Sequence, residues 1–557
     1  MQRPCRFHVP FLFLLLLPMM LRAQGLHRHP VVGAVTDNSA IIAVWLNGGG
    51  AVRIAYGADS AGTGGQLSDP ARPAAGANGA LKIALANLLP STRYYYVVVD
   101  STGTPISPRQ SFATFPTAGT DAPVSLLFGS CQQNRATDSG RVFTIGRALG
   151  GNVFLQLGDW GYPDARIAGY PDAAGTIEAS YELRLDTTYR FASDILSRMP
   201  VAYEWDDHDY AGDNSNGSNA GLRDSLLAAY DRHIPHYPLA NPAEGIWHSF
   251  RLGNVEVFMI DDRSQRRPAD SAFNGNTFAP KPGHSMLAGY PVSGTDQRTW
   301  LLDALRRSTA RWKIIVSQVV FNPALAPAIQ LSLLAGRRDA ALQFADKWIG
   351  YPEDIDSIRT LINAGYLRNT LVVSGDAHTN VYDDGTHSLI PEFMAANLDH
   401  DSSAVFQQLK ALGFNVWTGY EESGSRTIGH IVVETTPRHR LIVESFDTSG
   451  TRQLIYSMVD SSSGVETPAG SAEAWRIESV RVQGSMVRIG MVNAPDVQAR
   501  VEIYDVMGRL MADRIETTAA GGELQPAIGG LPAGVYFGRI RMAHQVRVVR
   551  FTTRGAG

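Results

Sequence analysis

The chain has 557 residues, enough for about four domains of average length, so a single small module is excluded. Hydrophobic residues make up 44% and charged residues 18%, an ordinary globular composition that excludes a disordered or coiled-coil protein. The 49 basic and 53 acidic residues give a net charge of -4, which provides no electrostatic surface for nucleic acid or anionic lipid.

Residues 1–24 have the pattern of a secretory signal peptide. Arg3 and Arg6 precede an apolar run from Val9 to Met20, and Ala23 lies near a plausible cleavage point. The alternative is a membrane anchor, but about twelve apolar residues interrupted by Pro18 are fewer than the roughly 20 that span a bilayer. We therefore expect a secreted or cell-surface protein, exported through the periplasm, with no transmembrane segment.

Residues 25–118 contain short alternating strands, such as Ser39 to Trp45 and Tyr94 to Val99, separated by turn residues. This spacing is typical of a β-sandwich. The stretch LLPSTRYYY, from Leu88 to Tyr96, resembles the fibronectin-like domain that precedes certain phosphatases. We expect no chemistry from this domain.

Residues 119–459 show a different pattern, in which apolar runs end in polar residues. The runs are VSLLFGSC, VFLQLGD, PVAYEWDDHD, VEVFMIDDR, WKIIVSQ and TLVVSGDAH. Helical stretches lie between them, for example Tyr181 to Met199 and Gln297 to Arg307. Buried strands with polar groups at their carboxyl ends predict an α/β catalytic domain with its site at those ends.

Residues 460–471 are rich in Ser, Gly, Thr and Pro and indicate a linker, and residues 472–557 form a further small β unit. This unit resembles the C-terminal sorting domain of the type IX secretion system, which implies the type IX secretion machinery as a partner. The matching residues are Tyr504, Asp505, Gly508, Arg509, Gly534 and Tyr536. The alternative is a generic β-sandwich that serves binding or stability.

Four short segments hold the ionisable residues that a metal-dependent hydrolase needs, and each begins where an apolar strand stops. They are Gly129-Ser130-Cys131, Gly158-Asp159-Trp160-Gly161-Tyr162, Asp206-Asp207-His208-Asp209 and Gly375-Asp376-Ala377-His378. Cys5 lies in the predicted signal peptide, so Cys131 is the one thiol of the mature chain and has no disulfide partner. A buried apolar role, an oxidation-sensitive thiol and a metal ligand all remain open for it.

Asp159 and Tyr162 share one tight loop, so a carboxylate and a phenol can face the same cation. Because the free pKa of Tyr is near 10, a phenolate forms at neutral pH only beside a strongly Lewis-acidic ion such as Fe(III). The alternative is an ordinary Gly-Asp turn with the Tyr packed over it.

Asp206 to Asp209 places three carboxylates and a His in four residues, and a cation would relieve their repulsion. The alternative is a solvated acidic turn, although the run follows the apolar PVAYEW. His208 is a candidate metal ligand, proton donor or charged neighbour of a phosphate. Asp376 and His378 are two residues apart and share a face in an extended segment. A core His capped by an Asp is the alternative there.

Together these segments resemble the alkaline phosphatase D (PhoD-like) family of metallophosphatases, over about residues 28 to 458. Further matching segments are Ile260-Asp261-Asp262-Arg263 with Arg266, QRTWL at 297–301, Trp312 to Gln318 and Trp348 to Tyr351. The resemblance implies an α/β fold with a calcineurin-like core, in which two central β-sheets are flanked by helices, between two small β-sandwich domains.

The resemblance also implies two metals. Its Fe(III) ligands would be Cys131, Asp159, Tyr162 and His378, and its second-metal ligands Asp207, Asp376 and Asn214. The second site is rich in oxygen, which favours Ca²⁺, with Mg, Mn or Zn as alternatives. The segment Ala211 to Asn214 departs from the family pattern, so the Asn214 assignment rests on position alone.

The implied activity is that of a secreted alkaline phosphatase, which hydrolyses phosphate esters by attack of metal-activated hydroxide. His208 would protonate the leaving oxygen, and Arg263 would position the phosphate unless it forms an ion pair with Asp261 or Asp262. Two alternatives stay open. One is phosphodiesterase or phospholipase D-type activity on phosphodiesters, including phospholipids or nucleic acid, and the other is a non-enzymatic, calcium-binding secreted adhesin.

Overall fold

The protein is described here from a computed structural model. The structure describes residues 25–60, 65–135, 140–291, 293–436, 438–460, 476–483, 486–492, 498–505, 510–517, 523–529, 531–542 and 545–553. The predicted signal peptide, Gly508, Arg509 and all but the first residue of the predicted 460–471 linker lie outside these residues. The chain divides into two compact units, Met1–Ser461 and Ser462–Gly557.

The first unit contains a nine-stranded sheet whose centre is parallel. Its order is β22 (Arg452–Val459), β21 (Arg440–Asp447), β20 (Thr427–Glu434), β8 (Val124–Gly129), β9 (Val153–Gln156), β10 (Val201–Tyr203), β1 (Val31–Gly33), β2 (Ala40–Trp45) and β5 (Ala80–Leu85). Strands β8, β9, β10 and β1 run parallel to their neighbours in that order. Their carboxyl ends therefore meet at one edge of the sheet.

A second sheet of the same unit has seven strands. Its order is β11 (His248–Leu252), β12 (Val255–Met259), β15 (Trp312–Val316), β16 (Thr370–Ser374), β18 (Glu392–Ala395), β17 (Asn380–Asp383) and β19 (Gly419–Tyr420). Strands β12, β15, β16 and β18 are parallel. Every residue of β15 and β16 is buried, which explains their continuous apolar sequences.

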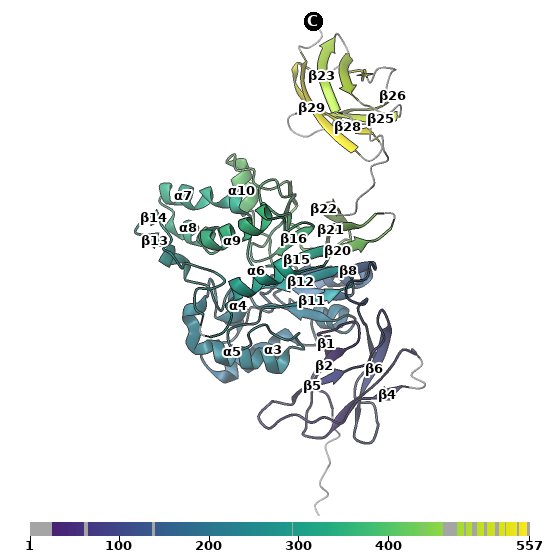
Figure 1. The fold of residues 1–557 in the computed structure, drawn as a ribbon, viewed down its shortest axis with the longest axis vertical. Coiled ribbons are helices and arrows are strands. Elements are labelled where there is room, and N and C mark those ends of the chain that lie inside the picture. The colour runs from purple at the N-terminus through teal and green to yellow at the C-terminus, as the bar shows by residue number, and fades with distance from the viewer. Residues whose placement is uncertain are drawn as a thin grey trace, which may run out of the picture. The chain divides into compact units, whose positions relative to one another are not determined.

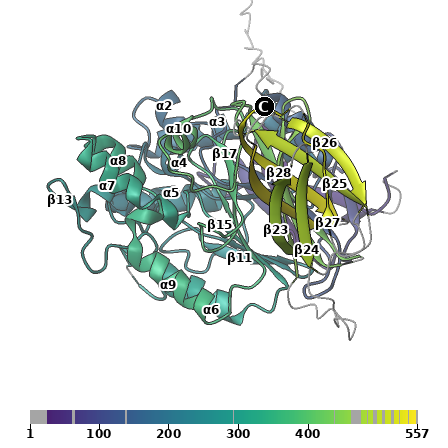
Figure 2. The same cartoon turned by 90° about the horizontal axis from the view of Figure 1, so that it is seen from above.

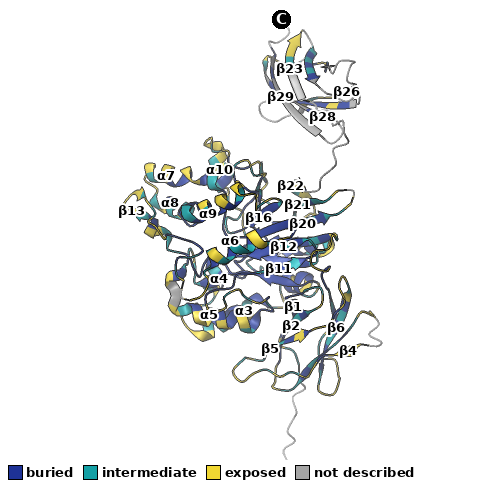
Figure 3. Ribbon diagram, viewed as in Figure 1, coloured by how far each residue is buried: buried dark blue, intermediate teal, exposed yellow. Residues whose placement is uncertain are grey.

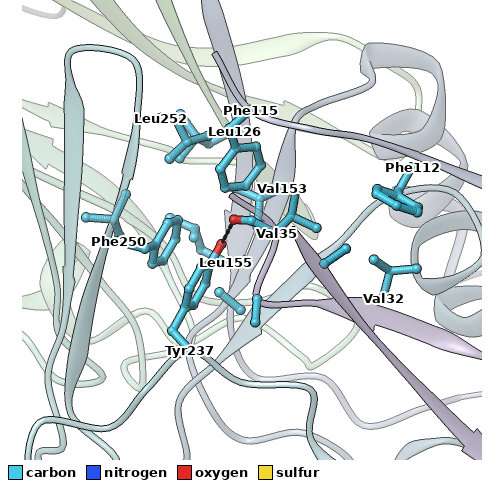
Figure 4. Packing of buried hydrophobic residues seen from close by; sticks show 14 of the residues in the cluster. Val32, Val35, Phe112, Phe115, Leu126, Val153, Leu155, Tyr237, Phe250 and Leu252 are labelled. Carbon is cyan, nitrogen blue, oxygen red and sulfur yellow. Dashed lines mark hydrogen bonds between the residues drawn. The ribbon is translucent and has the colours of Figure 1, made fainter. Parts of the chain in front are cut away.

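The two sheets pack face to face. One apolar cluster contains Leu126 and Leu155 from the first sheet together with Val257, Ile314 and Val373 from the second. Figure 4 shows part of this cluster at close range, and Figure 3 shows that the central strands are buried. This packing places the polar carboxyl ends of both parallel sets beside a common dry core.

Helices cover the outer faces of both sheets. On the first sheet lie α1 (Arg141–Leu149), α3 (Ala174–Arg184) and α5 (Ala220–His233). On the second lie α6 (Gln297–Arg307) and α9 (Pro352–Asn363), which are side by side in Figure 1 and Figure 2. The layers are thus helix, sheet, sheet and helix, and the predicted α/β fold class is confirmed. The predicted helix over Tyr181 to Met199 is interrupted, because α3 ends at Arg184 and a π-helical turn follows at Ala192–Leu196.

Several other elements of this unit are short. They include α2 (Pro163–Arg166), α4 (Asp207–Tyr210), α7 (Pro327–Leu334), α8 (Arg338–Ala345), α10 (Val405–Ala411), β13 (Phe273–Asn274) and β14 (Thr277–Phe278). None of the described helices has the length and apolarity needed to cross a membrane.

The N-terminal strands are part of the nine-stranded sheet. Strands β1, β2 and β5 belong to the nine-stranded sheet, and β1 pairs in parallel with β10, with Gly33 opposite Val201. A separate four-stranded sheet has the order β4 (Gln66–Leu67), β3 (Val52–Gly57), β6 (Arg93–Asp100) and β7 (Gln110–Ala113). Ile42 of the nine-stranded sheet lies in one apolar cluster with Ile54 and Phe112 of the four-stranded sheet. The likeness of this region to a fibronectin-like domain stays a prediction.

The second unit consists of two antiparallel sheets. One has the order β23 (Arg476–Gln483), β24 (Met486–Val492) and β27 (Glu523–Leu524), and the other β26 (Leu510–Thr517), β25 (Gln498–Asp505), β28 (Gly534–Met542) and β29 (Gln545–Thr553). Val487 and Ile489 of the first sheet share one apolar cluster with Val501, Ile540 and Phe551 of the second. The sorting role predicted for this unit stays a prediction.

Candidate metal centre

The site lies where the parallel strands of both sheets end. Cys131 follows β8, Asp159 follows β9, and the Asp206 to Asp209 run follows β10 in the first sheet. Asp376 and His378 follow β16 in the second sheet. The four predicted segments therefore converge, as expected for the carboxyl ends of parallel strands.

Two glycines allow the loops after these strands to touch. Gly158 has a φ of 91°, and a Cβ added to it would overlap the side chain of Asp206. A Cβ added to Gly375 would lie 2.6 Å from Oγ of Ser130. The loops after β9 and β10, and those after β8 and β16, are thus pressed together more closely than any side chain would permit.

Six of the predicted metal ligands have left-handed backbone conformations. The φ angles are 59° at Cys131, 56° at Asp159, 49° at Tyr162, 53° at Asn214, 66° at Asp376 and 50° at His378. Residues with a Cβ rarely adopt positive φ angles. Those that do are concentrated at functional sites. The surrounding packing therefore holds these loops in a strained form that aims their side chains at one another.

The first donor group consists of Cys131, Asp159 and His378. Their ligand atoms all lie within 4.8 Å of one another. The Tyr162 hydroxyl donates to Oδ2 of Asp159 at 2.9 Å and lies 3.0 Å from Nε2 of His378. All four residues predicted for the first metal are therefore together.

Burial holds the thiol and the phenol of this group in their neutral forms, and a bound cation would be needed to ionise them. Burial and the charge of Asp159 raise the pKa of the Cys131 thiol and of the Tyr162 phenol well above their usual values. Burial and the neighbouring His400 lower the pKa of His378 to about 3, so its imidazole is neutral and free to act as a ligand. The His400 ring stacks on that of His378 at a centroid distance of 3.8 Å.

The second donor group consists of carboxylates. Ligand atoms of Asp206, Asp207 and Asp376 lie within 4.8 Å of one another, and a further such group joins Asp159, Asp207 and His208. Asp159 thus belongs to the first group and also shares a donor group with Asp207. Asp206 was not among the predicted ligands. The sequence of the segment from Asp206 to Asp209 does not show which of its carboxylates points toward the metal centre.

The residues fit bound cations. Oδ1 of Asp159 and Oδ2 of Asp206 are buried and have no hydrogen-bond partner among the described residues. An unpaired buried carboxylate oxygen is costly, and a metal ion would satisfy it. The thiol, carboxylate and imidazole of this group are donors that transition-metal ions bind.

Arg263 does not contact the cavity, which corrects its predicted role as a phosphate ligand. The side chain is fully buried, with Nε 2.6 Å from Oδ1 of Asp206 and Nη1 3.0 Å from Oδ2 of Asp346. Its Nη2 lies 3.6 Å from Asp207 and 3.7 Å from Asp376. Arg263 therefore offsets the negative charge of the second donor group from the buried side of the site. The alternative ion pair with Asp261 or Asp262 was also misplaced, since the partners are these four carboxylates.

Asn214 reaches the site through its backbone. Its N–H donates to Oδ2 of Asp207 at 2.8 Å, whereas its side-chain amide donates to Asp213. It lines the cavity beside the carboxylates. Its predicted role as a direct ligand stays a prediction.

Two further residues that the sequence did not indicate, Lys347 and Asp164, also contact predicted ones. Lys347 forms an ion pair with Asp376 and lies 3.9 Å from Asp346. Oδ2 of Asp164 lies 2.7 Å from Nδ1 of His208. The only signal for Lys347 was its place directly before the matching Trp348 to Tyr351 segment, and Asp164 lies two residues beyond Tyr162.

His208 lies at the wall of an open cavity of about 490 Å³, which Asp159, Asp207, Asp376 and His378 also line. Burial lowers the pKa of His208, but the hydrogen bond to Asp164 and the charges of Asp159 and Asp207 outweigh it and raise the pKa to about 11. The His208 ring packs on that of Tyr162 at a centroid distance of 4.5 Å. A protonated imidazole is therefore held at the edge of the candidate metal centre.

Comparisons with known proteins agree with this geometry. The model of the family described as PhoD-like phosphatase matches residues 152–435, just over half of the chain. The chain belongs to the PhoD-like phosphatase family. Asp159, Asp207, Asp376 and His378 lie within the matched range of this family, and Cys131 lies before it.

Two relatives of this PhoD-like chain show how far the similarity extends. Alkaline phosphatase D of Bacillus subtilis (strain 168) is 24% identical over 321 residues, which are 53% of this chain and 52% of that protein. The chain thus spans about half the length of that curated relative. The solved structure of PhoD has a TM-score of 0.56 at 18% identity and covers 77% of this chain and 89% of that one, which shows a shared fold.

Proposed function

We propose that this PhoD-like protein is a metal-dependent hydrolase of phosphate esters, of the alkaline phosphatase type. The observation that carries the proposal is the convergence of Cys131, Asp159, Tyr162 and His378 on one point at the floor of an open cavity. A structural role alone would not require a thiol, a phenol and an imidazole to share that point with a carboxylate in strained backbone conformations.

The donor types favour two different cations. Cys131, Asp159, Tyr162 and His378 would hold Fe(III), which prefers anionic donors and stabilises a phenolate. Asp207 and Asp376, with Asp206, offer only oxygen atoms and would hold Ca²⁺, with Mg²⁺ or Mn²⁺ as competitors. When bound, such cations neutralise phosphate charge and lower the pKa of water toward neutrality.

The side chains of the cavity supply orientation and a proton. Asp164 holds Nδ1 of His208, which fixes the ring and leaves Nε2 as the proton donor for the leaving oxygen. Lys347 lines the same cavity and adds a positive charge beside Asp376. Arg263 is buried beside Asp206 and Asp376, offsets part of their negative charge and does not line the cavity.

The test combines metal analysis with product analysis on the purified full chain. We expect bound iron and calcium, a visible tyrosinate-to-iron absorption band, and release of phosphate from a monoester such as 4-nitrophenyl phosphate. A diester and a phospholipid are assayed in parallel, since preferential turnover of either would replace the monoester assignment by a phosphodiesterase. Inertness toward all three substrates, with calcium bound and no iron band, would support the adhesin alternative instead.

A further inference from the structure

The cavity over the metal centre has a second, apolar lining. Beside the acidic residues it is lined by Val320, Leu325, Ala340, Phe344, Val405 and Phe406. Val320 lies after β15, Leu325 ends a short helical turn, and the other four come from α8 and α10. Apolar side chains from three separate segments thus meet in the cavity that also contains the candidate catalytic groups.

This lining is a firm part of the fold. Val320, Leu325 and Phe406 are buried members of one apolar cluster, and Phe344 and Val405 are half-buried and pack against it. The Phe406 ring contacts Trp417 at a centroid distance of 5.2 Å. Because α7 and α8 also pack on each other, the apolar side is preformed.

The volume exceeds what a phosphate group alone needs. Cavities of about 490 Å³ fall in the range that binds whole small molecules, whose apolar parts contact the walls while a few polar groups fix their orientation. With the phosphorus held at the carboxylates, the organic part of the ester has to occupy the remaining space. Arg337 and Asp339, which also line the cavity, are exposed and carry opposite charges, and Gln343 and Ser403 in the lining are uncharged.

We propose that the substrates are phosphate esters whose organic group is apolar, and that Phe344 and Val405 determine this specificity by contacting that group. This inference rests on the proposed hydrolase function and names its substrate class. Phe344 and Val405 are the residues to test, because they are half-exposed in the cavity whereas Phe406 is buried in the core.

The experiment uses the metal-loaded full chain and a series of n-alkyl phosphates from ethyl to octyl. The alcohols of this series differ little in acidity, so a trend in kcat/KM reports contact with the alkyl chain and not leaving-group chemistry. We expect kcat/KM to rise with chain length, by up to about fourfold for each methylene that becomes buried, until the cavity is filled. Glycerol phosphate, with a polar organic group, is expected to resemble ethyl phosphate.

Variants locate the contact. Phe344→Ala and Val405→Thr are each expected to lower kcat/KM for octyl phosphate by about tenfold and for ethyl phosphate by less than twofold. Phe344→Leu, which keeps an apolar side chain, is expected to restore most of the preference. The matched control is Leu334→Ala, because Leu334 is 75% exposed on the adjacent α7 and does not line the cavity.

Binding of n-octylphosphonate and ethylphosphonate, measured by calorimetry, gives a readout that does not need turnover. Tighter binding of the octyl compound, lost in Phe344→Ala, supports the inference. A flat alkyl series with equal binding of both phosphonates overturns it, as does a Phe344→Ala variant that weakens all esters equally. If no ester is hydrolysed, the proposed function fails, and the phosphonate binding still decides whether the cavity selects apolar groups.

Discussion

The two donor groups of the candidate metal centre are built on opposite principles. In the first group the partner of Asp159 is the neutral hydroxyl of Tyr162. In the second group Asp206 is paired with Arg263, and Asp376 with Lys347. The protein therefore supplies its own positive charge to the second group and leaves the first to be neutralised by a bound ion.

The pKa values of two neighbouring carboxyls express this difference. Burial raises the pKa of both, and in Asp159 the charges of Asp207 and Asp206 raise it further, to well above its usual value. In Asp207 the charges of Arg263 and His208 outweigh burial, and the pKa falls below its usual value. In Asp206 and Asp376 burial outweighs the charges of Arg263 and Lys347, and the pKa stays above its usual value. We infer that the first group depends more strongly on its metal than the second, because the paired cations offset part of the charge of the second group. The following experiments test this contrast.

The largest effect is expected for Asp159→Asn. Asp159 lies in the first donor group and also shares a donor group with Asp207 of the second. Loss of its charge should lower kcat by about 1,000-fold, as removal of a preorganised charge-stabilising group does, and reduce the content of both metals. Steady-state kinetics and elemental analysis measure these changes. Asp339→Asn is the matched control, since Asp339 lines the same cavity outside the donor groups. Full metal content with unchanged kcat would contradict the assignment.

Cys131→Ala separates the two groups. The fully buried thiol belongs only to the first group, so the variant should lose about 100-fold in iron affinity and its visible band, and retain calcium. Absorption spectra and elemental analysis follow both metals in one sample. Equal loss of the two metals would mean that the groups do not act independently, and unchanged iron content would exclude Cys131 as a ligand.

Lys347→Met tests whether the charge of the Lys347 ammonium group stabilises the second donor group. Removal of Lys347 leaves Asp376, which is only 10% exposed, with the more distant Arg263, whose Nη2 lies 3.7 Å away, as its ion-pair partner. In chelator the free energy of unfolding should fall by about 2 kcal/mol, somewhat less than for a fully buried pair. Added calcium should restore most of the loss, because the ion takes over the charge of Lys347. Chemical denaturation with and without calcium measures both values. A loss that calcium does not reverse would show that the pair stabilises packing alone.

Lys347 also shows where sequence reasoning stopped. Cys131, Asp159, Asp207 and His378 could be predicted, because each follows an apolar strand and the ends of parallel strands converge. Lys347 was not, because it comes from a segment between helices that has no motif of its own.

Arg263 was noticed for its charge but given the wrong partners, since burial beneath the carboxylates has no signature in residue spacing. The pairing of β1 with β10 was missed for a related reason. It joins strands about 170 positions apart across an expected domain boundary, and neither strand's own sequence specifies its neighbour.

The smallest effect concerns Glu392, a buried carboxyl that resembles Asp159 in having neutral partners but lies in none of the donor groups. Its Oε1 accepts from Oγ of Ser374 at 2.6 Å and from the N–H of Phe321 at 2.9 Å, and its Oε2 has no hydrogen-bond partner among the described residues. Burial raises its pKa to about 7 despite these hydrogen bonds. The folded state thus holds this proton more tightly than the unfolded chain does. Stability from this group is complete below the unfolded pKa and is lost as pH rises toward 7.

Glu392→Gln should therefore be more stable than the natural chain by about 1 kcal/mol at pH 8 and equal to it at pH 4.5, because the amide never ionises. Denaturant titrations at the two pH values measure the difference. Metal content should not change, in contrast to Asp159→Asn, since Glu392 belongs to no possible metal-binding group among the described residues. A variant less stable at both pH values would show that the carboxyl's hydrogen bonds outweigh its burial. If Glu392→Gln lost metal, Glu392 would affect the first donor group without belonging to it. The contrast between the two groups would then no longer hold.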